Sequence, residues 1–167
     1  MRDVWIALIA VGVGSVLTVF AQEVARWLAK RRRRRALALL VCSTLDRFVA
    51  DCQAAINDEG EYPRGTRRPS VPMPTGPEFP AEIDWTSIDA AMAYRILSLR
   101  AATVTVDHEL SYLEEELHDP PENDPWFSHR RKRCHKLLSE ASQLSSALRE
   151  MAGLPPASDN PFDNIWG

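Results

Sequence analysis

Residues 124–156 read DPWFSHRRKRCHKLLSEASQLSSALREMAGLPP, and this stretch carries the marks of one complete helix. Asp124 can cap its first turn, and Pro125 suits the first helical position because no backbone N–H is needed there. Gly153 stands where a left-handed C-cap belongs, and Leu154 can add the hydrophobic contact of a Schellman motif. Between these ends, apolar residues recur every three or four positions, which predicts one buried stripe: Cys134, Leu137, Ala141, Leu144, Leu148 and Met151.

Two further segments have the same helical rhythm. Residues 36–57 place their stripe at Val41, Leu45, Phe48, Cys52 and Ala55. The other segment starts near Asp84, a good N-cap, and ends at about His118. Its stripe comprises Met92, Ile96, Leu99, Thr103, Val106, Leu110, Leu113 and Leu117. The β-branched residues 103–106 have low helix propensity, so we expect a bend or short break around 100–106.

Three apolar stripes without a strand candidate predict an all-α fold, an antiparallel three-helix bundle. Pairing between chains as a coiled coil is the alternative use of the same stripes. A proline-rich loop, residues 58–83, separates the first two helices, and its prolines exclude both helix and central strand. We expect this loop to stay extended at the end of the bundle away from the membrane, where it could lie over the helices, and the turn around Pro120 and Pro121 to lie at the other end.

An uncharged run precedes the three segments. Residues 4–22, VWIALIAVGVGSVLTVFAQ, would span about 28 Å as a helix, which matches the hydrocarbon core of a membrane. Trp5 and Trp27 flank the run in the two headgroup zones. A signal peptide or a buried core helix is the alternative, but no small-residue cleavage site follows the run. We therefore predict a single N-terminal transmembrane helix within residues 1–29.

The charges beside this run predict its orientation. A polybasic collar occupies residues 30–35, with Lys30 followed by Arg31, Arg32, Arg33, Arg34 and Arg35. Because Lys and Arg stay on the cytoplasmic side, we expect the N-terminus outside and residues 30–167 in the cytoplasm, most simply at a bacterial inner membrane. The collar could also contact anionic lipid. Nucleic-acid binding is disfavoured, because residues 1–35 carry a charge of +6 but residues 36–167 carry −9.

Small residues recur every fourth position inside the run, at Ala10, Gly14 and Thr18. Such a stripe lets two membrane helices approach closely, so it is one route to a homo-oligomer. The general abundance of Gly and Ala in membrane helices is the alternative explanation.

A second basic cluster opens the segment quoted first. It comprises Arg130, Arg131, Lys132, Arg133 and Lys136, with the aromatic residues Trp126 and Phe127 beside it. In an antiparallel bundle this cluster would lie near the membrane, where aromatic and basic side chains are typical of lipid contact. A solvated helix face is the alternative. The acidic residues Glu114, Glu115 and Glu116 would then face the collar, which predicts an electrostatic contact between them.

The chain has no recognisable catalytic or cofactor motif. Cys42, Cys52 and Cys134 lack metal-ligand spacing, and scattered cysteines in a cytoplasmic domain indicate reduced, buried thiols. The four histidines lack the i, i+4 spacing of a helical zinc pair. We therefore expect no cofactor, no metal site and no enzymatic activity, with an enzyme that has no visible motif as a third alternative.

These segments combine into one functional hypothesis. Residues 36–154 form a cytoplasmic helical bundle, and residues 155–167 form an extended tail in which Phe162 and Trp166 could dock on a protein partner or on the bundle. The protein is then a membrane-anchored scaffold that presents its bundle to a protein partner or to itself. The alternative is an anionic-lipid-binding or membrane-remodelling module that uses both basic clusters.

Overall fold

The computed structural model describes residues 2–117 and 124–157, and it describes side chains for residues 20–63, 65–115 and 124–157. In this part of the chain the fold is all-α, with no β-strand, which confirms the predicted class. Its three helices are α1 (Arg2–Asn57), α2 (Ala90–Leu117) and α3 (Asp124–Ala152). Two short 3₁₀ turns, η1 (Pro63–Gly65) and η2 (Trp85–Ser87), interrupt the connection between α1 and α2.

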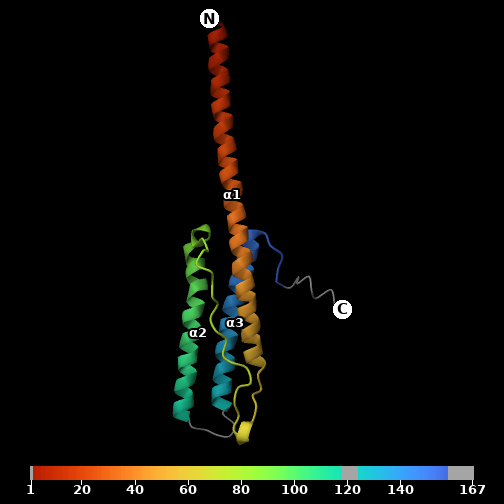
Figure 1. Cartoon of the computed structure of the whole chain (residues 1–167), viewed down its shortest axis with the longest axis vertical. Coiled ribbons are helices and arrows are strands. Elements are labelled where there is room, and N and C mark those ends of the chain that lie inside the picture. Colours follow the sequence, from red (N-terminus) through yellow and green to blue (C-terminus); the bar gives the residue numbers. More distant parts are fainter. Residues whose placement is uncertain (1, 118–123, 158–167) are drawn as a thin grey trace, which may run out of the picture.

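α1 is one uninterrupted helix of 56 residues. The first half of α1 projects beyond the other helices, and only its second half lies in the bundle (Figure 1). The residues predicted to form the anchor, the collar and the first bundle helix are thus parts of a single element. Across the side chains that the structure describes, no helix contains a stretch long and apolar enough to cross a membrane. Residues 4–19 of the predicted span lie outside those side chains.

The directions of the helices differ from the prediction. α1 and α2 run the same way, and α3 runs back along both (Figure 1). Two hydrogen bonds join the middle of α1 to the start of α2 and to the end of α3. Arg34 Nε donates to the Ser87 carbonyl just before α2 begins, and Arg35 Nε donates to the Ala152 carbonyl where α3 ends, both at 3.0 Å. The predicted antiparallel pairing of α1 and α2 is therefore wrong, because the proline-rich loop is not a turn at one end.

The connection 58–89 instead runs the length of the bundle as an extended strap (Figure 1). α2 has 28 residues and is about 42 Å long, a distance that an extended connection of this length covers easily. Strap residues 75–78 border α1, and on the other side Gly76 lies against α2. A Cβ on Gly76 would stand 2.5 Å from the Arg100 Cα, so only glycine permits this close approach. Because α1 and α2 run in the same direction, the connection between them has to return along the whole bundle, which explains its length.

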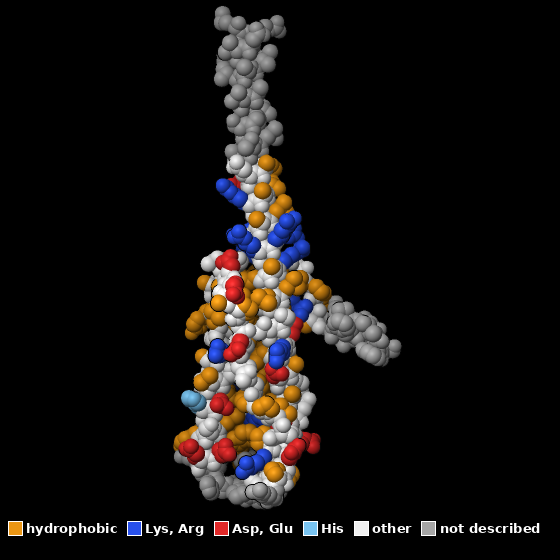
Figure 2. Space-filling model, viewed as in Figure 1, with side chains coloured by type: hydrophobic (Ala, Val, Ile, Leu, Met, Phe, Trp, Pro, Cys, Tyr) orange, Lys and Arg blue, Asp and Glu red, His pale blue; other side chains and the backbone are white. Residues whose placement is uncertain are grey.

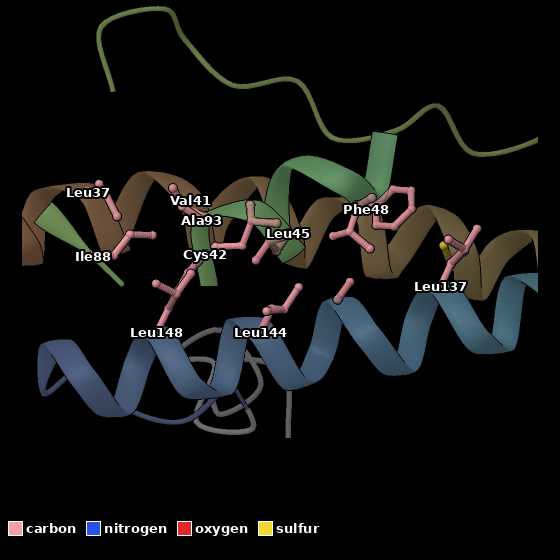
Figure 3. Close-up of a cluster of buried hydrophobic side chains, with 14 of the residues drawn as sticks. Leu37, Val41, Cys42, Leu45, Phe48, Ile88, Ala93, Leu137, Leu144 and Leu148 are labelled. Atoms are coloured by element: carbon pink, nitrogen blue, oxygen red, sulfur yellow. The ribbon is translucent and has the colours of Figure 1, made fainter. Parts of the chain in front are cut away.

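The core lies where the stripes predicted it. Figure 3 shows α1 and α3 facing each other across a cluster of buried apolar side chains, to which Ala93 of α2 and Ile88, just after η2, also contribute. Every stripe residue of α1 is buried, as are those of α3 except Met151, which is 37% exposed while the neighbouring Ala152 is buried. Burying each large apolar side chain contributes about 1.5–3 kcal/mol. The strap adds Met73, Phe79 and Ile83 at the edge of this core.

The C-terminal end of α3 follows the predicted capping residues, but the start of α2 does not. Gly153 has φ +62°, and the Gly153 and Leu154 amides donate to the Glu150 and Arg149 carbonyls, which is the predicted Schellman motif. Asp84 caps η2 rather than α2. The residue that accepts from the first amides of α2 is Asp89.

α2 shows no break at residues 100–106. The helix continues from Ala90 to Leu117, in contrast to the expected bend. The hydroxyls of Thr103 and Thr105 donate back to carbonyls of their own helix, at Leu99 and Ala101. Thr103 and Val106 are buried, so packing outweighs the low propensity of the β-branched residues.

Candidate functional site

The part of α1 that leaves the bundle combines exposed apolar and basic side chains. Residues 20–33, here called the stem, are all exposed. Trp27 is 58% exposed, and the other large apolar side chains of the stem are similarly open to solvent: Phe20, Val24 and Leu28. Basic side chains gather around α1 just above the bundle (Figure 2). This composition is unusual for a helix face in water, and it makes the stem a candidate contact surface.

The collar is held against the bundle from two sides. Arg34 Nε bonds the Ser87 carbonyl of η2, and Arg35 Nε bonds the Ala152 carbonyl at the end of α3. A cation at the C-terminal end of a helix is favourable, because carbonyls without helical partners gather there. Arg31 lies over the Trp27 ring, 5.4 Å from its centroid. The fold therefore fixes the directions of these guanidinium groups.

Two clefts open where the stem meets the bundle. The first, here called the collar cleft, has a volume of about 360 Å³ between the stem and the end of α3. Its cationic lining residues are Lys30, Arg31, Arg34 and Arg35, and Trp27 and Met151 add apolar surface. The second cleft, of about 410 Å³, lies between the stem and η2 and is lined by Arg26, Lys30 and Arg33 among others. Arg32 borders neither of these clefts.

The acidic end of α2 does not meet the collar. Because α2 runs parallel to α1, the segment that ends with Glu114, Glu115 and Glu116 lies at the far end of the bundle (Figure 1). The predicted electrostatic contact is therefore wrong. Among the described residues, the collar instead donates hydrogen bonds to the backbone carbonyls of Ser87 and Ala152. Hydrogen bonds from Thr86 and Ser87, helped by the charge of Arg33 in the collar, lower the pKa of Asp84.

The second basic cluster also lies at the far end, and part of it is inside the bundle. Arg130 is only 1% exposed, and its guanidinium donates to Asp58 Oδ2 at 2.7 Å and to the Val71 carbonyl at 2.6 Å. Arg133 pairs with Glu109 at 2.6 Å. Trp126 is half-buried against the core, while Lys132 is exposed. These residues cannot form one lipid-facing surface together with the collar, because the length of the bundle separates them.

Asp58 explains why Arg130 is buried. Burial raises the pKa of Asp58, but hydrogen bonds from Ser70, Arg130 and the amides of Gly60 and Val71 outweigh it and hold that pKa well below its ordinary range. Arg131 donates to the Asp58 backbone carbonyl at 3.5 Å. This cluster ties the start of the strap to α3, and its role is structural.

A feature that the sequence analysis missed is the outer face of α2. Tyr94 is 75% exposed, and Leu97, Ala101 and Val104 are exposed on the same face. Apolar side chains are visible at the surface over the first half of α2 (Figure 2). The spacing of these four residues repeats that of the buried stripe 96, 99, 103 and 106, shifted by two positions, which is about 200° around a helix. This second repeat was the sequence signal for the face.

The three cysteines lie inside the bundle. Cys42, Cys52 and Cys134 are free and buried, and burial raises the pKa of the Cys52 thiol to about 12. His129 contacts Glu109 at 3.1 Å. Among the described side chains, no group of three metal-ligating residues could hold an ion.

Several predicted contact residues lie outside the described side chains. They are Trp5, Ala10, Gly14 and Thr18 in α1 and Phe162 and Trp166 in the tail.

No protein-family model, no curated protein and no solved structure matches this chain. A functional assignment therefore depends on the residues described above.

Proposed function

We propose that this chain is a single-pass membrane protein without enzymatic activity, anchored by the first part of α1, whose cytoplasmic bundle binds a second copy of itself. The observation that carries the proposal is the continuity of α1. Residues 36–57 of this helix supply core side chains, and the same helix continues far beyond the bundle. The uncharged run 4–22 on the projecting part needs an apolar surrounding, and its length suits a hydrocarbon core.

The composition of the stem, where α1 would leave the membrane, also supports the proposed anchor. Its exposed Trp27 and Leu28 are followed directly by the collar. Aromatic side chains favour the headgroup zone, and Lys and Arg favour its cytoplasmic side. The orientation that follows places the N-terminus outside and the bundle in the cytoplasm.

The outer face of α2 is the surface on which the scaffold role depends. Anchored copies in one membrane have parallel α2 helices, so Leu97 and Val104 would each meet their own counterparts. The neighbouring positions Ser98 and Thr105 are uncharged, so like charges do not oppose each other there. An antiparallel pair would bring Arg100 beside Asp107, but it would point the two stems in opposite directions, which one membrane does not allow.

The anchor is tested with two arginines in the middle of the run. Val13→Arg with Val16→Arg should cost about 3 kcal/mol per charge at the bilayer centre. We expect alkaline carbonate to release this variant from membranes of expressing cells, whereas the wild type stays in the pellet. The matched control is Val13→Leu with Val16→Leu, which should behave as the wild type. Release of the wild-type chain by carbonate would contradict the anchor.

The orientation of the chain in the membrane is tested separately, with a reporter fusion. A reporter fused after Gly167 that is active only outside the cytoplasm should be silent. Reporter activity would reverse the orientation while leaving the anchor intact.

Anionic-lipid binding remains the second candidate function, and the collar cleft is the observation that favours it. The cleft faces the level of the headgroups if the run 4–22 is in the membrane. The distant cluster at Arg130–Arg133 does not contribute to this proposed lipid binding, because Arg130 and Arg133 form ion pairs within the bundle.

A further inference from the structure

Among the residues that the structure describes, the cations of the collar cleft have no carboxylate partner within ion-pair distance. These cations are Lys30, Arg31, Arg34 and Arg35. Glu150 borders the same cleft, but it is a single negative charge against four positive ones. A concave site with this excess of positive charge attracts an anion from solution.

The geometry of the two inner arginines suits one particular class of anion. Arg34 and Arg35 are each fixed to a backbone carbonyl through Nε, at 3.0 Å. Among the described residues, no hydrogen bond engages their terminal amino groups, which are therefore available to a ligand. The planar guanidinium group binds phosphate through two parallel hydrogen bonds, and an arginine that is already held in place loses less side-chain freedom on binding.

The remaining lining residues indicate what surrounds the phosphate. Trp27 and the partly exposed Met151 give the cleft an apolar side, next to the cationic one. Lys30 and Arg31 extend the positive charge one turn along the stem, in the direction of the uncharged run. A ligand with a phosphate at one end and an apolar part at the other would match both sides.

We propose that the collar cleft is a specific binding site for a phosphate group, carried by an anionic lipid or by a soluble phosphate ester. Only the lipid source rests on the proposed membrane function. The site itself is distinct from a diffuse attraction between a basic collar and a negatively charged surface. The difference lies in position, because Arg31 borders the cleft whereas the adjacent Arg32 does not.

That neighbouring pair supplies a matched experiment. The full chain is purified in a neutral detergent and titrated with a short-chain phosphatidylglycerol, and native mass spectrometry counts the bound lipids. We expect wild type and Arg32→Gln to retain the lipid alike. Arg31→Gln should bind about tenfold more weakly, because it loses a charge-assisted hydrogen bond. Lys30→Gln, which also borders the cleft, should weaken binding in the same direction without touching a bond within the bundle.

Two further titrations separate the sources of the phosphate. Short-chain phosphatidylcholine, which is neutral overall, should be retained far less than phosphatidylglycerol. Glycerol phosphate that displaces the lipid at similar concentration would assign the site to a soluble ester, whereas displacement only at much higher concentration would assign it to lipid. Either result upholds the phosphate site.

Three results would overturn the site. These are equal weakening by Arg31→Gln and Arg32→Gln, retention of phosphatidylcholine as strong as that of phosphatidylglycerol, and no retained lipid or ester in the wild type. Because these measurements are made in detergent, their failure is independent of the carbonate extraction that tests the anchor.

Discussion

The buried pair of Arg130 and Asp58 is the individual contact on which the far end of the bundle depends. Both side chains are almost completely removed from solvent. Burying two charges is costly, and the cost is met here because the carboxylate accepts several hydrogen bonds while the guanidinium also reaches the Val71 carbonyl. Loss of one partner would leave the other charge buried and unpaired.

Arg130→Met should therefore destabilise the bundle by about 3 kcal/mol or more. The matched control is Arg133→Met, one turn along α3, whose ion pair with Glu109 is about one-third exposed and should contribute at most about 1 kcal/mol. Urea unfolding of the detergent-solubilised full chain, followed by circular dichroism, measures both. Equal losses for the two variants would contradict a special role of the buried pair.

The sequence could not distinguish these two arginines. Arg130 and Arg133 belong to one basic run, and both were expected at a lipid surface. What separates them is Asp58, which is 72 positions earlier in the chain. Periodicity within a helix predicts which of its faces is buried, but it does not reveal a distant partner for a charge.

The strap is the element that sets the topology. Its prolines keep it extended, and Gly76 lets it lie directly against the backbone of α2. The stripes of α1 and α3 could be predicted nearly residue by residue because each depends on local spacing alone. The path of the strap depends on contacts with two helices at once, so the sequence predicted its extended form but wrongly placed it at one end of the bundle.

Gly76→Ala should weaken the contact between strap and α2. The added Cβ would meet the Arg100 Cα and the Thr103 hydroxyl, and the backbone of a helix cannot easily move away. We expect a loss of about 1–3 kcal/mol, as for other overpacked sites, seen as a lower thermal midpoint by circular dichroism. Thr75→Ala, at the exposed neighbouring position, should change the midpoint little. An unchanged midpoint for Gly76→Ala would mean that the strap can shift freely.

At the scale of the whole molecule, the outer face of α2 stays uncovered by the residues that the structure describes. α3 packs against both other helices, so α2 keeps a second apolar stripe on its outer side. The sequence pattern predicts a single stripe for this segment, with pairing between chains as the alternative use of that stripe. The structure uses the predicted stripe of α2 in the core of the bundle and leaves the second stripe exposed.

A parallel pair of α2 helices should cross-link through Leu97→Cys. The native cysteines are buried, so mild oxidation of the full chain in membranes should join the two new thiols and give a covalent dimer. Ala102→Cys, exposed on α2 but off the stripe, is the matched control and should remain monomeric. No dimer for Leu97→Cys, or equal dimer for both, would contradict self-association through this face. A dimer formed only when Leu97→Cys is mixed with His108→Cys would indicate antiparallel pairing.

The unbroken length of α1 has a mechanical consequence. A helix without a kink turns as one rigid rod. Because residues 41–55 of α1 are packed against α3, the bundle turns together with the projecting part of the helix. Residue 13 is the centre of the uncharged run 4–22 that the proposed anchor places in the membrane. From there to Asn57, α1 measures about 66 Å. A change of about 10° in its inclination carries the far end, and the Asp58 cluster with it, through about 12 Å. A small change in the tilt of the first turns of α1 therefore produces a large displacement of the far end of the bundle.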